Sequence, residues 1–234
     1  MRALLAEIAS GALAPGGAAL RETDIATRFG VSRGVARECV RGLEERGLVS
    51  VKPGRGATVN PPDRWAVLDP EVVSALLDGE RGLEILGEYL ECRRILEIEA
   101  VALAAERADD ADLAALADGV ARMTEAADRA AVNPAARDRY HEADLAFHGA
   151  LIAATHNSAL AAMLSPLWRA LGAVRGTAAR PLERSVAAHR RILAAIAMRD
   201  ADGARAAMRD HLVGVERDLH EPPDRRGVDE HRAA

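Results

Sequence analysis

A helix, a tight turn and a second, basic helix near the N-terminus constrain this fold most strongly. Residues 22–29 predict a short helix that ends at Gly30, because glycine readily adopts the left-handed conformation that ends helices. Ser32 then offers a side-chain oxygen to cap the next helix. That helix carries three arginines at a spacing of four, which places them along one side, namely Arg33, Arg37 and Arg41. A basic face directly after a tight turn is typical of a helix that docks into the major groove of DNA.

The residues that follow predict a β-hairpin wing. Residues 48–52 and 57–60 favour short strands around a Pro-Gly-Arg-Gly turn at 53–56. A further helix is expected at residues 3–10. Four apolar side chains are expected to pack beneath the basic helix, namely Val35, Val40, Leu43 and Leu48. Residues 1–60 therefore predict a winged helix-turn-helix domain with three helices and a small hairpin.

The charge of the chain is divided unevenly along its length. Residues 1–60 carry nine Lys or Arg and six Asp or Glu, a balance of +3, whereas the remainder carries 22 and 30, a balance of −8. Positive charge confined to one part favours a nucleic-acid module joined to a module with another task. We find no apolar run of about 20 residues and no signal-peptide core. The sequence therefore predicts a cytoplasmic protein that binds double-stranded DNA and no membrane.

The rest of the chain predicts an all-α antiparallel helical bundle over residues 70–219, after a linker at 61–69. Its apolar residues recur at intervals of three and four, and no sustained alternation indicates a strand. The expected helices are 83–107, about 109–133, 134–156, one from Asn157 or Ser158, 182–199 and 201–219, with Pro166 expected to kink or end the fourth. The charged, proline-containing tail at 220–234 is expected to be disordered. The fold class is thus mainly α.

The two cysteines argue against a disulfide framework and against a zinc site built from thiolates. Cys39 and Cys92 are isolated in the sequence and have no C-x-x-C partner, so we interpret them as packed free thiols.

Histidines in the predicted bundle favour a metal site. Asp144 and His148 lie four residues apart, so both side chains leave the same face of one helix. His189 and His211 lie on the apolar stripes of two further helices. One carboxylate and three imidazoles directed at a common interior suit a divalent ion. Zinc is the metal that we expect, with nickel or manganese as alternatives. Each could instead be a hydrogen-bonded core residue, and His141, three residues before Asp144, could substitute as a ligand.

Specific motifs resemble those of one family of regulators. The run from Val31 to Val40, V-S-R-G-V-A-R-E-C-V, and the later G-L-V at 47–49 resemble the winged-helix domain of the GntR family of bacterial transcription regulators. The bundle resembles the FCD ligand domain of that family's FadR branch. Its motifs here are Arg93-x-x-x-Glu97, Ala104-Ala105-Glu106-Arg107, Asp144-x-x-Phe147-His148, Asn157, His189 and His211-Leu212. The resemblance covers nearly everything from Leu4 to Leu219.

The resemblance implies roles for particular residues. It aligns Asp144, His148, His189 and His211 with the metal ligands of metal-containing FCD domains, and Arg93 with an arginine that binds an effector carboxylate; a structural ion pair between Arg93 and Glu97 is the alternative. The DNA contacts that it implies are Ser32, Arg33, Gly34, Arg37, Arg55 and Gly56. Family members usually have threonine and proline at the positions of Gly34 and Val35. Trp65 with Leu68-Asp69-Pro70 resembles the branch that senses sugar acids.

Together these features predict a metabolite-responsive regulator that is not an enzyme. We expect a homodimeric repressor that binds an inverted-repeat operator and responds to a small organic acid held at the metal. A regulator that senses the metal itself is one alternative. A metal-dependent hydrolase is another, with Glu142 or His141 as its general base.

Overall fold

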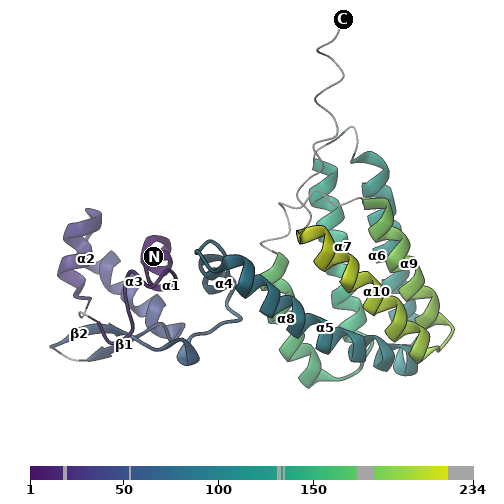
Figure 1. Cartoon of the computed structure of the whole chain (residues 1–234), viewed down its shortest axis with the longest axis horizontal. Helices are drawn as coiled ribbons and strands as arrows, with labels where there is room; N and C mark the ends of the chain where they lie inside the picture. Colours follow the sequence, from purple (N-terminus) through teal and green to yellow (C-terminus); the bar gives the residue numbers. More distant parts are fainter. Residues whose placement is uncertain (18–19, 53, 131–132, 134, 173–181, 221–234) are drawn as a thin grey trace, which may run out of the picture. The chain divides into compact units, whose positions relative to one another are not determined.

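The protein divides into two compact units. The computed structural model describes residues 1–17, 20–52, 54–130, 133, 135–172 and 182–220 (Figure 1). Among the described residues, one unit contains Met1–Tyr89 and 169–172, and the other contains Leu90–Trp168 and 182–220. The predicted divisions at 1–60, 61–69 and 70–219 stay a prediction. Residues 221–234, on which the prediction of a disordered tail rests, lie outside the described residues.

The first unit is a winged helix-turn-helix, as predicted. Its elements are α1 (Arg2–Ala9), α2 (Glu22–Phe29), α3 (Arg33–Glu45), β1 (Val49–Lys52), β2 (Gly56–Val59), the short 3-10 helix η1 (Pro62–Arg64) and α4 (Pro70–Leu77). Gly30 ends α2 in the left-handed conformation, with φ of 63°. The hydroxyl oxygen of Ser32 accepts a hydrogen bond from the backbone N–H of Val35 at 3.2 Å and caps α3. The two expected signals of the turn are therefore confirmed.

The core of this unit uses one face of α3. Ala36, Val40 and Leu43 lie four and three residues apart and are buried, together with Leu48 and side chains of α1. Val35 was expected among them, and that expectation is wrong, because its side chain is 49% exposed. It lies one position before Ala36 and therefore points away from the buried stripe. Val35 is therefore an apolar side chain on the exposed surface of α3.

The wing is an antiparallel pair of strands. β1 pairs with β2 in the register Val49↔Val59 to Lys52↔Gly56, and Leu20 forms an additional bridge with Ala57. Gly56 has a φ of 85°, and a Cβ atom at this position would lie 2.8 Å from the carbonyl oxygen of Leu20. A glycine is therefore required where the chain before α2 meets the wing.

The second unit consists of helices in the described residues, as predicted. They are α6 (Asp110–Arg129), α7 (Ala135–Ala153), α9 (Leu182–Ala197), α10 (Ala201–His220), α8 (Ser158–Gly172) as far as Trp168 and, from Leu90 onward, α5 (Gly82–Arg107). Helix α6 packs against α7 and α9, and α9 packs against α10 (Figure 1). The short connection between α9 and α10 joins antiparallel neighbours. Among the described helices, none is long and apolar enough to cross a membrane.

Several details differ from the sequence-based expectations. Helix α7 ends at Ala153, not at residue 156, because the hydroxyl of Thr155 donates to the carbonyl of Ile152 and His156 adopts a φ of 48°. Helix α8 continues through Pro166, so the early break does not occur. Both cysteines are free thiols, but Cys92 is exposed, so the interpretation of packed thiols is wrong for that residue.

Candidate functional site

The first turn of α3 presents the residues predicted to contact DNA. Ser32, Arg33, Gly34 and Arg37 are all exposed. Arg37 Nε lies 3.4 Å from a carboxylate oxygen of Glu22, and both side chains are solvated. Surface ion pairs of this kind contribute about 0–1 kcal/mol, so a phosphate or a base edge can replace the carboxylate at little expense in free energy. The geometry therefore leaves the N-terminal end of α3 available to a polyanion.

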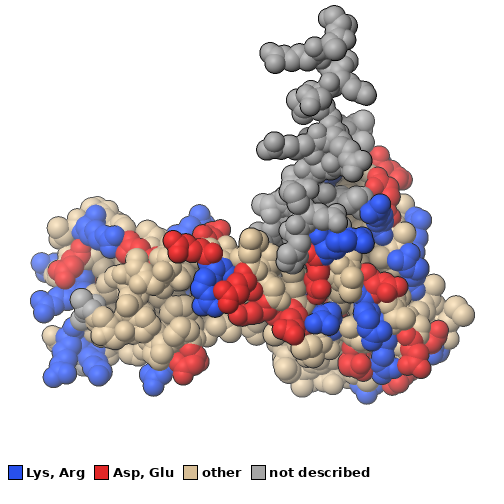
Figure 2. Space-filling view, viewed as in Figure 1, with Lys and Arg blue, Asp and Glu red and all other residues tan. Residues whose placement is uncertain are grey.

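The wing adds positive charge to the same unit. Arg55 is exposed in the turn between β1 and β2, and Lys52 is exposed beside it, whereas Gly56 is partly buried against the chain. Figure 2 shows Lys and Arg side chains gathered at the end of this unit where Figure 1 places α2 and the hairpin. A basic helix and a basic wing on one small unit are typical of winged-helix DNA binding.

The second unit brings the predicted metal ligands together in its interior. Helix α7 supplies Asp144 and His148, α9 supplies His189, and α10 supplies His211; all four side chains are buried. The three imidazoles each offer a nitrogen, and these nitrogens lie within 4.8 Å of one another. Asp144 Oδ1 lies 3.1 Å from His189 Nε2 and 3.9 Å from His148 Nε2. Such a mixed set of imidazole and carboxylate donors can hold a divalent ion.

Backbone and carboxylate oxygens orient two of these imidazoles. His148 Nδ1 lies 3.2 Å from Glu97 Oε2, and His189 Nδ1 lies 2.8 Å from the carbonyl oxygen of Ser185. Their Nε2 atoms face each other at 3.3 Å. The hydrogen bond from Nδ1 fixes the tautomer of His189 and leaves its Nε2 as the lone-pair donor, which is the usual arrangement around metal-bound histidines. At His148 the contact with Glu97 is a charge contact beside Nδ1 and not a hydrogen bond.

The charges of the site are coupled. Burial alone raises the pKa of Asp144, but its contacts with His189 and His148 outweigh this effect and lower the pKa well below its usual range. Burial likewise raises the pKa of Glu97, but attraction to Arg93 and His148 outweighs this effect and lowers the pKa below its usual value. Burial lowers the pKa of the His148 imidazole despite its carboxylate neighbours. Deprotonated carboxylates and a neutral imidazole are the states that bind metal ions.

Arg93 lies beside this cluster, and only part of its guanidinium group forms a hydrogen bond with the described residues. Its Nε donates to Glu97 Oε1 at 2.6 Å, and its Cζ lies 4.0 Å from the ring centroid of Trp168. The side chain is 0% exposed, and neither Nη1 nor Nη2 has a hydrogen-bond partner among the described residues. The predicted ion pair with Glu97 is therefore present, yet it occupies only one of the nitrogens of Arg93.

Some of the neighbourhood was not predicted. The sequence placed Glu97 one turn after Arg93 but did not indicate its contact with His148, and it did not indicate that Trp168 stacks on His148 with ring centroids 3.9 Å apart. These contacts join helices far apart in the sequence. His141 is not part of the cluster of imidazoles. A second, largely exposed group of potential ligands consists of Asp109, Asp112 and His156.

Comparison with protein families identifies both parts of the chain. The model described as "Bacterial regulatory proteins, gntR family" matches residues 1–59, and the model described as "FCD domain" matches residues 88–214. The family and the relatives of this chain are transcription regulators and not enzymes, so the hydrolase alternative is wrong.

Curated relatives of similar length agree with this assignment. The galactonate operon transcriptional repressor of Escherichia coli K12 is 28% identical over 92% of this chain and 93% of the relative. The Uxu operon regulator of Haemophilus influenzae is 31% identical over 93% of this chain and 79% of the relative. The regulator LutR of Bacillus subtilis is 30% identical over 89% and 94% of the two chains.

Solved structures share the fold. The Listeria monocytogenes regulator Lar aligns with a TM-score of 0.60 over 94% of both chains at 20% identity. McbR/YncC of E. coli aligns with a TM-score of 0.53 over 94% of this chain and 95% of the other at 23% identity. Motifs, fold and relatives lead to one conclusion: the chain belongs to the GntR family of transcription regulators, with a winged-helix DNA-binding domain followed by an FCD domain.

Proposed function

We propose that this protein is a homodimeric repressor whose FCD domain binds a divalent metal ion and a small organic acid, and that the acid releases the operator. The observation that carries the proposal is Arg93, a buried guanidinium beside three imidazoles and a carboxylate, whose two terminal nitrogens have no partner among the residues described. A buried charged donor left without a partner costs about 1–3 kcal/mol or more. A bound carboxylate would remove this penalty.

The residues fit a metal ion. Asp144, His148, His189 and His211 would hold it, with Glu97 and the Ser185 carbonyl orienting two of the imidazoles. Three imidazoles and one carboxylate suit zinc, with nickel and manganese as alternatives. When bound, such an ion acts as a Lewis acid that attracts a carboxylate oxygen.

The balance of charge supports an anionic effector. The buried carboxylates of Glu97 and Asp144 contribute −2, and Arg93 contributes +1. A divalent ion would change the net charge of this group of buried residues from −1 to +1. A single carboxylate would then neutralise the site, and its two oxygens match the fork of the guanidinium.

The names of the relatives suggest which acid to test first. One relative represses a galactonate operon, and galactonate is a sugar acid. Two features led to the same hypothesis: Trp65 directly follows η1, and Leu68-Asp69-Pro70 forms the start of α4, with Asp69 as its cap and Pro70 as its first residue. We therefore propose a sugar acid as the effector class.

Repression would depend on two copies of the chain. A two-fold dimer places one α3 helix in each half of an inverted-repeat operator in the cytoplasm. The acid can release DNA only if it binds the free form more tightly than the DNA-bound form. A coupling free energy of about 1–3 kcal/mol is typical of such switches.

The first experiment is a thermal-shift screen of the purified protein against sugar acids, hydroxy acids and dicarboxylates, before and after chelation. A ligand at 100 times its Kd stabilises the folded protein by about 2.7 kcal/mol. We expect one class of acids to raise the unfolding temperature of metal-loaded protein and to lose this effect after chelation. A shift that survives complete chelation would contradict the proposed role of the metal.

The same screen tests a regulator that senses the metal itself. The cluster of three imidazoles supports this second candidate because the cluster alone could bind the ion. In that case the metal would shift the unfolding temperature, no acid would add to the shift, and operator affinity would follow the free metal concentration.

A further inference from the structure

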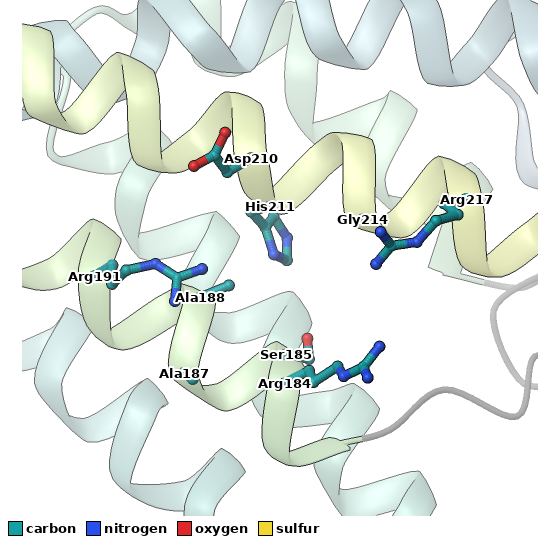
Figure 3. Close-up of a pocket in the computed structure, with 9 residues that line it drawn as sticks. All are labelled: Arg184, Ser185, Ala187, Ala188, Arg191, Asp210, His211, Gly214 and Arg217. Atoms are coloured by element: carbon teal, nitrogen blue, oxygen red, sulfur yellow. The ribbon is translucent and has the colours of Figure 1, made fainter.

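A pocket opens between α9 and α10 beside the candidate metal centre. It has a volume of about 240 Å³, and its lining includes Ser185 and His211 (Figure 3). His211 is one of the three clustered imidazoles, so the pocket reaches the wall of the metal centre. Pockets that enclose a whole drug-sized ligand begin at roughly 300 Å³. This pocket therefore suits one end of a small molecule.

Arginines dominate the charge of this pocket. Arg184 and Arg191 on α9 and Arg217 on α10 line it and are exposed, and none of the three forms an ion pair with another described residue. In Figure 3 their guanidinium groups extend toward the space beside His211. Asp210 is the acidic residue in the lining, so the net charge is +2. Guanidinium groups arranged in this way favour a carboxylate or a phosphate.

A buried hydroxyl group in the same pocket has no hydrogen-bond partner within the described part of the chain. Ser185 is 4% exposed, and its Oγ atom has no hydrogen-bond partner among the described residues. Its backbone carbonyl accepts from His189 Nδ1, so this residue contacts the imidazole cluster on one side while its hydroxyl points into the pocket (Figure 3). An unsatisfied buried hydroxyl indicates that a ligand or water completes this site.

A glycine keeps this pocket open. Gly214 lies inside α10, where glycine destabilises a helix by roughly 0.5–1 kcal/mol relative to alanine. A Cβ atom at Gly214 would meet nothing within 4 Å, so packing does not require a glycine there. The consequence of the missing side chain is space within the pocket.

From this geometry we infer that the pocket binds the second acidic group of the effector. This inference rests on the proposed function: one carboxylate occupies the metal and Arg93, and the distal carboxylate or phosphate lies among Arg184, Arg191 and Arg217. The effector class is then a small acid with an anionic group at each end, either a sugar diacid or a phosphorylated sugar acid. Monoacids lack the group that these arginines recognise.

The test compares matched acids by calorimetry on metal-loaded protein. Gluconate, glucarate and 6-phosphogluconate share a six-carbon chain and differ at the distal end, and inorganic phosphate probes the pocket alone. We expect glucarate or 6-phosphogluconate to bind at least about tenfold more tightly than gluconate, a difference of ~1.4 kcal/mol. The tighter of the two identifies the distal group as carboxylate or phosphate.

Two variants link this preference to the pocket. Gly214→Leu places a larger side chain at a position whose Cβ atom would meet nothing within 4 Å, and Arg191→Gln removes one charge. Each variant should lower the diacid-to-monoacid affinity ratio toward one. Gly149→Leu is the matched control, because Gly149 is an exposed helical glycine on α7 with open space around it, and the ratio should stay at its original value.

The outcomes separate this inference from the proposed function. Chelated protein that still binds phosphate, and loses this binding in Gly214→Leu, would support the pocket even if no acid required the metal. The inference is overturned if phosphate does not bind and no diacid exceeds gluconate. It is also overturned if Gly214→Leu and Gly149→Leu change the ratio equally.

Discussion

Arginine is used in opposite ways in the two units. On α3 the side chains of Arg37 and Arg41 are about two-thirds exposed and each lies near one carboxylate, Glu22 or Glu45. In the second unit Arg93 is fully buried and stacks on Trp168, and its two terminal nitrogens have no hydrogen-bond partner in the segments that the structure describes. Water satisfies the exposed guanidinium groups when no ligand is present, whereas no water-exposed surface is available to Arg93.

This difference indicates what each arginine can bind. An exposed arginine loses little when it exchanges a surface carboxylate for a phosphate, so α3 suits a large polyanion whose affinity is the sum of many weak contacts. A buried arginine has already lost its hydration, so one well-placed carboxylate stabilises it strongly. The first unit thus suits DNA and the second suits a small acid.

The largest expected effect is loss of the metal from the buried cluster. Replacing a residue that only orients a ligand typically lowers metal affinity 10–100-fold, so His189→Ala should lower it at least about 100-fold. Elemental analysis after dialysis should find about one ion per chain in the original protein and background levels in the variant.

His156→Ala is the control for this experiment. His156 belongs to the exposed group with Asp109 and Asp112, and its Nε2 lies 2.8 Å from Asp112 Oδ2. The variant should retain its metal. If His189→Ala keeps its metal and His156→Ala loses it, the metal binds at the exposed group with Asp109 and Asp112 and not in the buried cluster.

Operator binding should depend on the position of an arginine along α3. Arg33 begins the helix, and residues at this end of a recognition helix contact base edges. Arg33→Ala should weaken binding by ~1–3 kcal/mol, about 5–150-fold, and relax the base preference at one position of each half-site. The measurement is fluorescence anisotropy on an operator selected from random double-stranded DNA.

Arg41→Ala, near the C-terminal end of the same helix, is the matched control. Arg41 Nε lies 3.0 Å from Glu45, and its loss should change affinity less than about threefold, with no change in base preference. Equal losses in both variants would mean that α3 contributes only a general positive field.

Release of the operator by the organic-acid effector should depend on Arg93 and not on its neighbour Arg94. A hydrogen bond to a charged group contributes about 1.5–3 kcal/mol, so Arg93→Met should raise the acid concentration that releases the operator at least about tenfold. Arg94→Met is the control, because Arg94 is 43% exposed and its contacts with Glu91 and Glu216 are longer than 3.5 Å. Metal content, measured in parallel, should stay near one ion per chain in both variants. An unchanged release curve for Arg93→Met would mean that Arg93 only forms a structural ion pair with Glu97 and does not bind the effector.

Lowering the pH should destabilise the metal-free second unit in two stages. The pKa of His148 is lowered in the folded state, so the unfolded chain binds more protons once the pH falls below about 6.5, and stability then declines. The pKa values of Glu97 and Asp144 are also lowered, so their stabilisation is complete above about pH 4 and is lost as the pH falls further.

Urea unfolding of chelated protein at a series of pH values separates the two stages. His148→Gln should remove the decline that begins near pH 6.5 and leave the lower one. An unchanged profile in His148→Gln would show that this imidazole does not carry the first stage.

Local signals explain how much of this molecule could be predicted from its sequence. Gly30 and Ser32 determine the turn before α3 through their own backbone and side-chain chemistry, and both were identified from the sequence. The spacing of Asp144 and His148 likewise predicted a shared face on α7, although their role as ligands stays a prediction. Val35 was misplaced because one residue separates the buried stripe of α3 from its exposed face.

Contacts between distant helices could not be predicted in this way. Glu97 approaches His148 from α5, and Ser185 lies in a pocket bounded by α10. Nothing in the sequence around Glu97 or Ser185 indicates these partners, because the pairing depends on how the helices pack. The arginines of the pocket were missed for the same reason: along α9 and α10 they resemble the solvated charges of any surface helix.

The smallest effect distinguishes backbone conformation from crowding in the wing. Gly54 and Gly56 both have positive φ values, 73° and 85°, but a Cβ atom at Gly54 would meet nothing within 4 Å. Gly54→Ala should therefore destabilise the first unit by ~1 kcal/mol, from the conformational penalty alone. Gly56→Ala adds a contact of 2.8 Å with the Leu20 carbonyl and should destabilise it by roughly 2–3 kcal/mol. Thermal unfolding of the two variants measures the difference. If both variants lose the same stability, the segment at Leu20 can shift to accommodate a Cβ atom, and the reason for a glycine at position 56 would be its contact with DNA. If Gly56→Ala loses more stability, the glycine is required because the wing pairs closely with the chain that leads into α2.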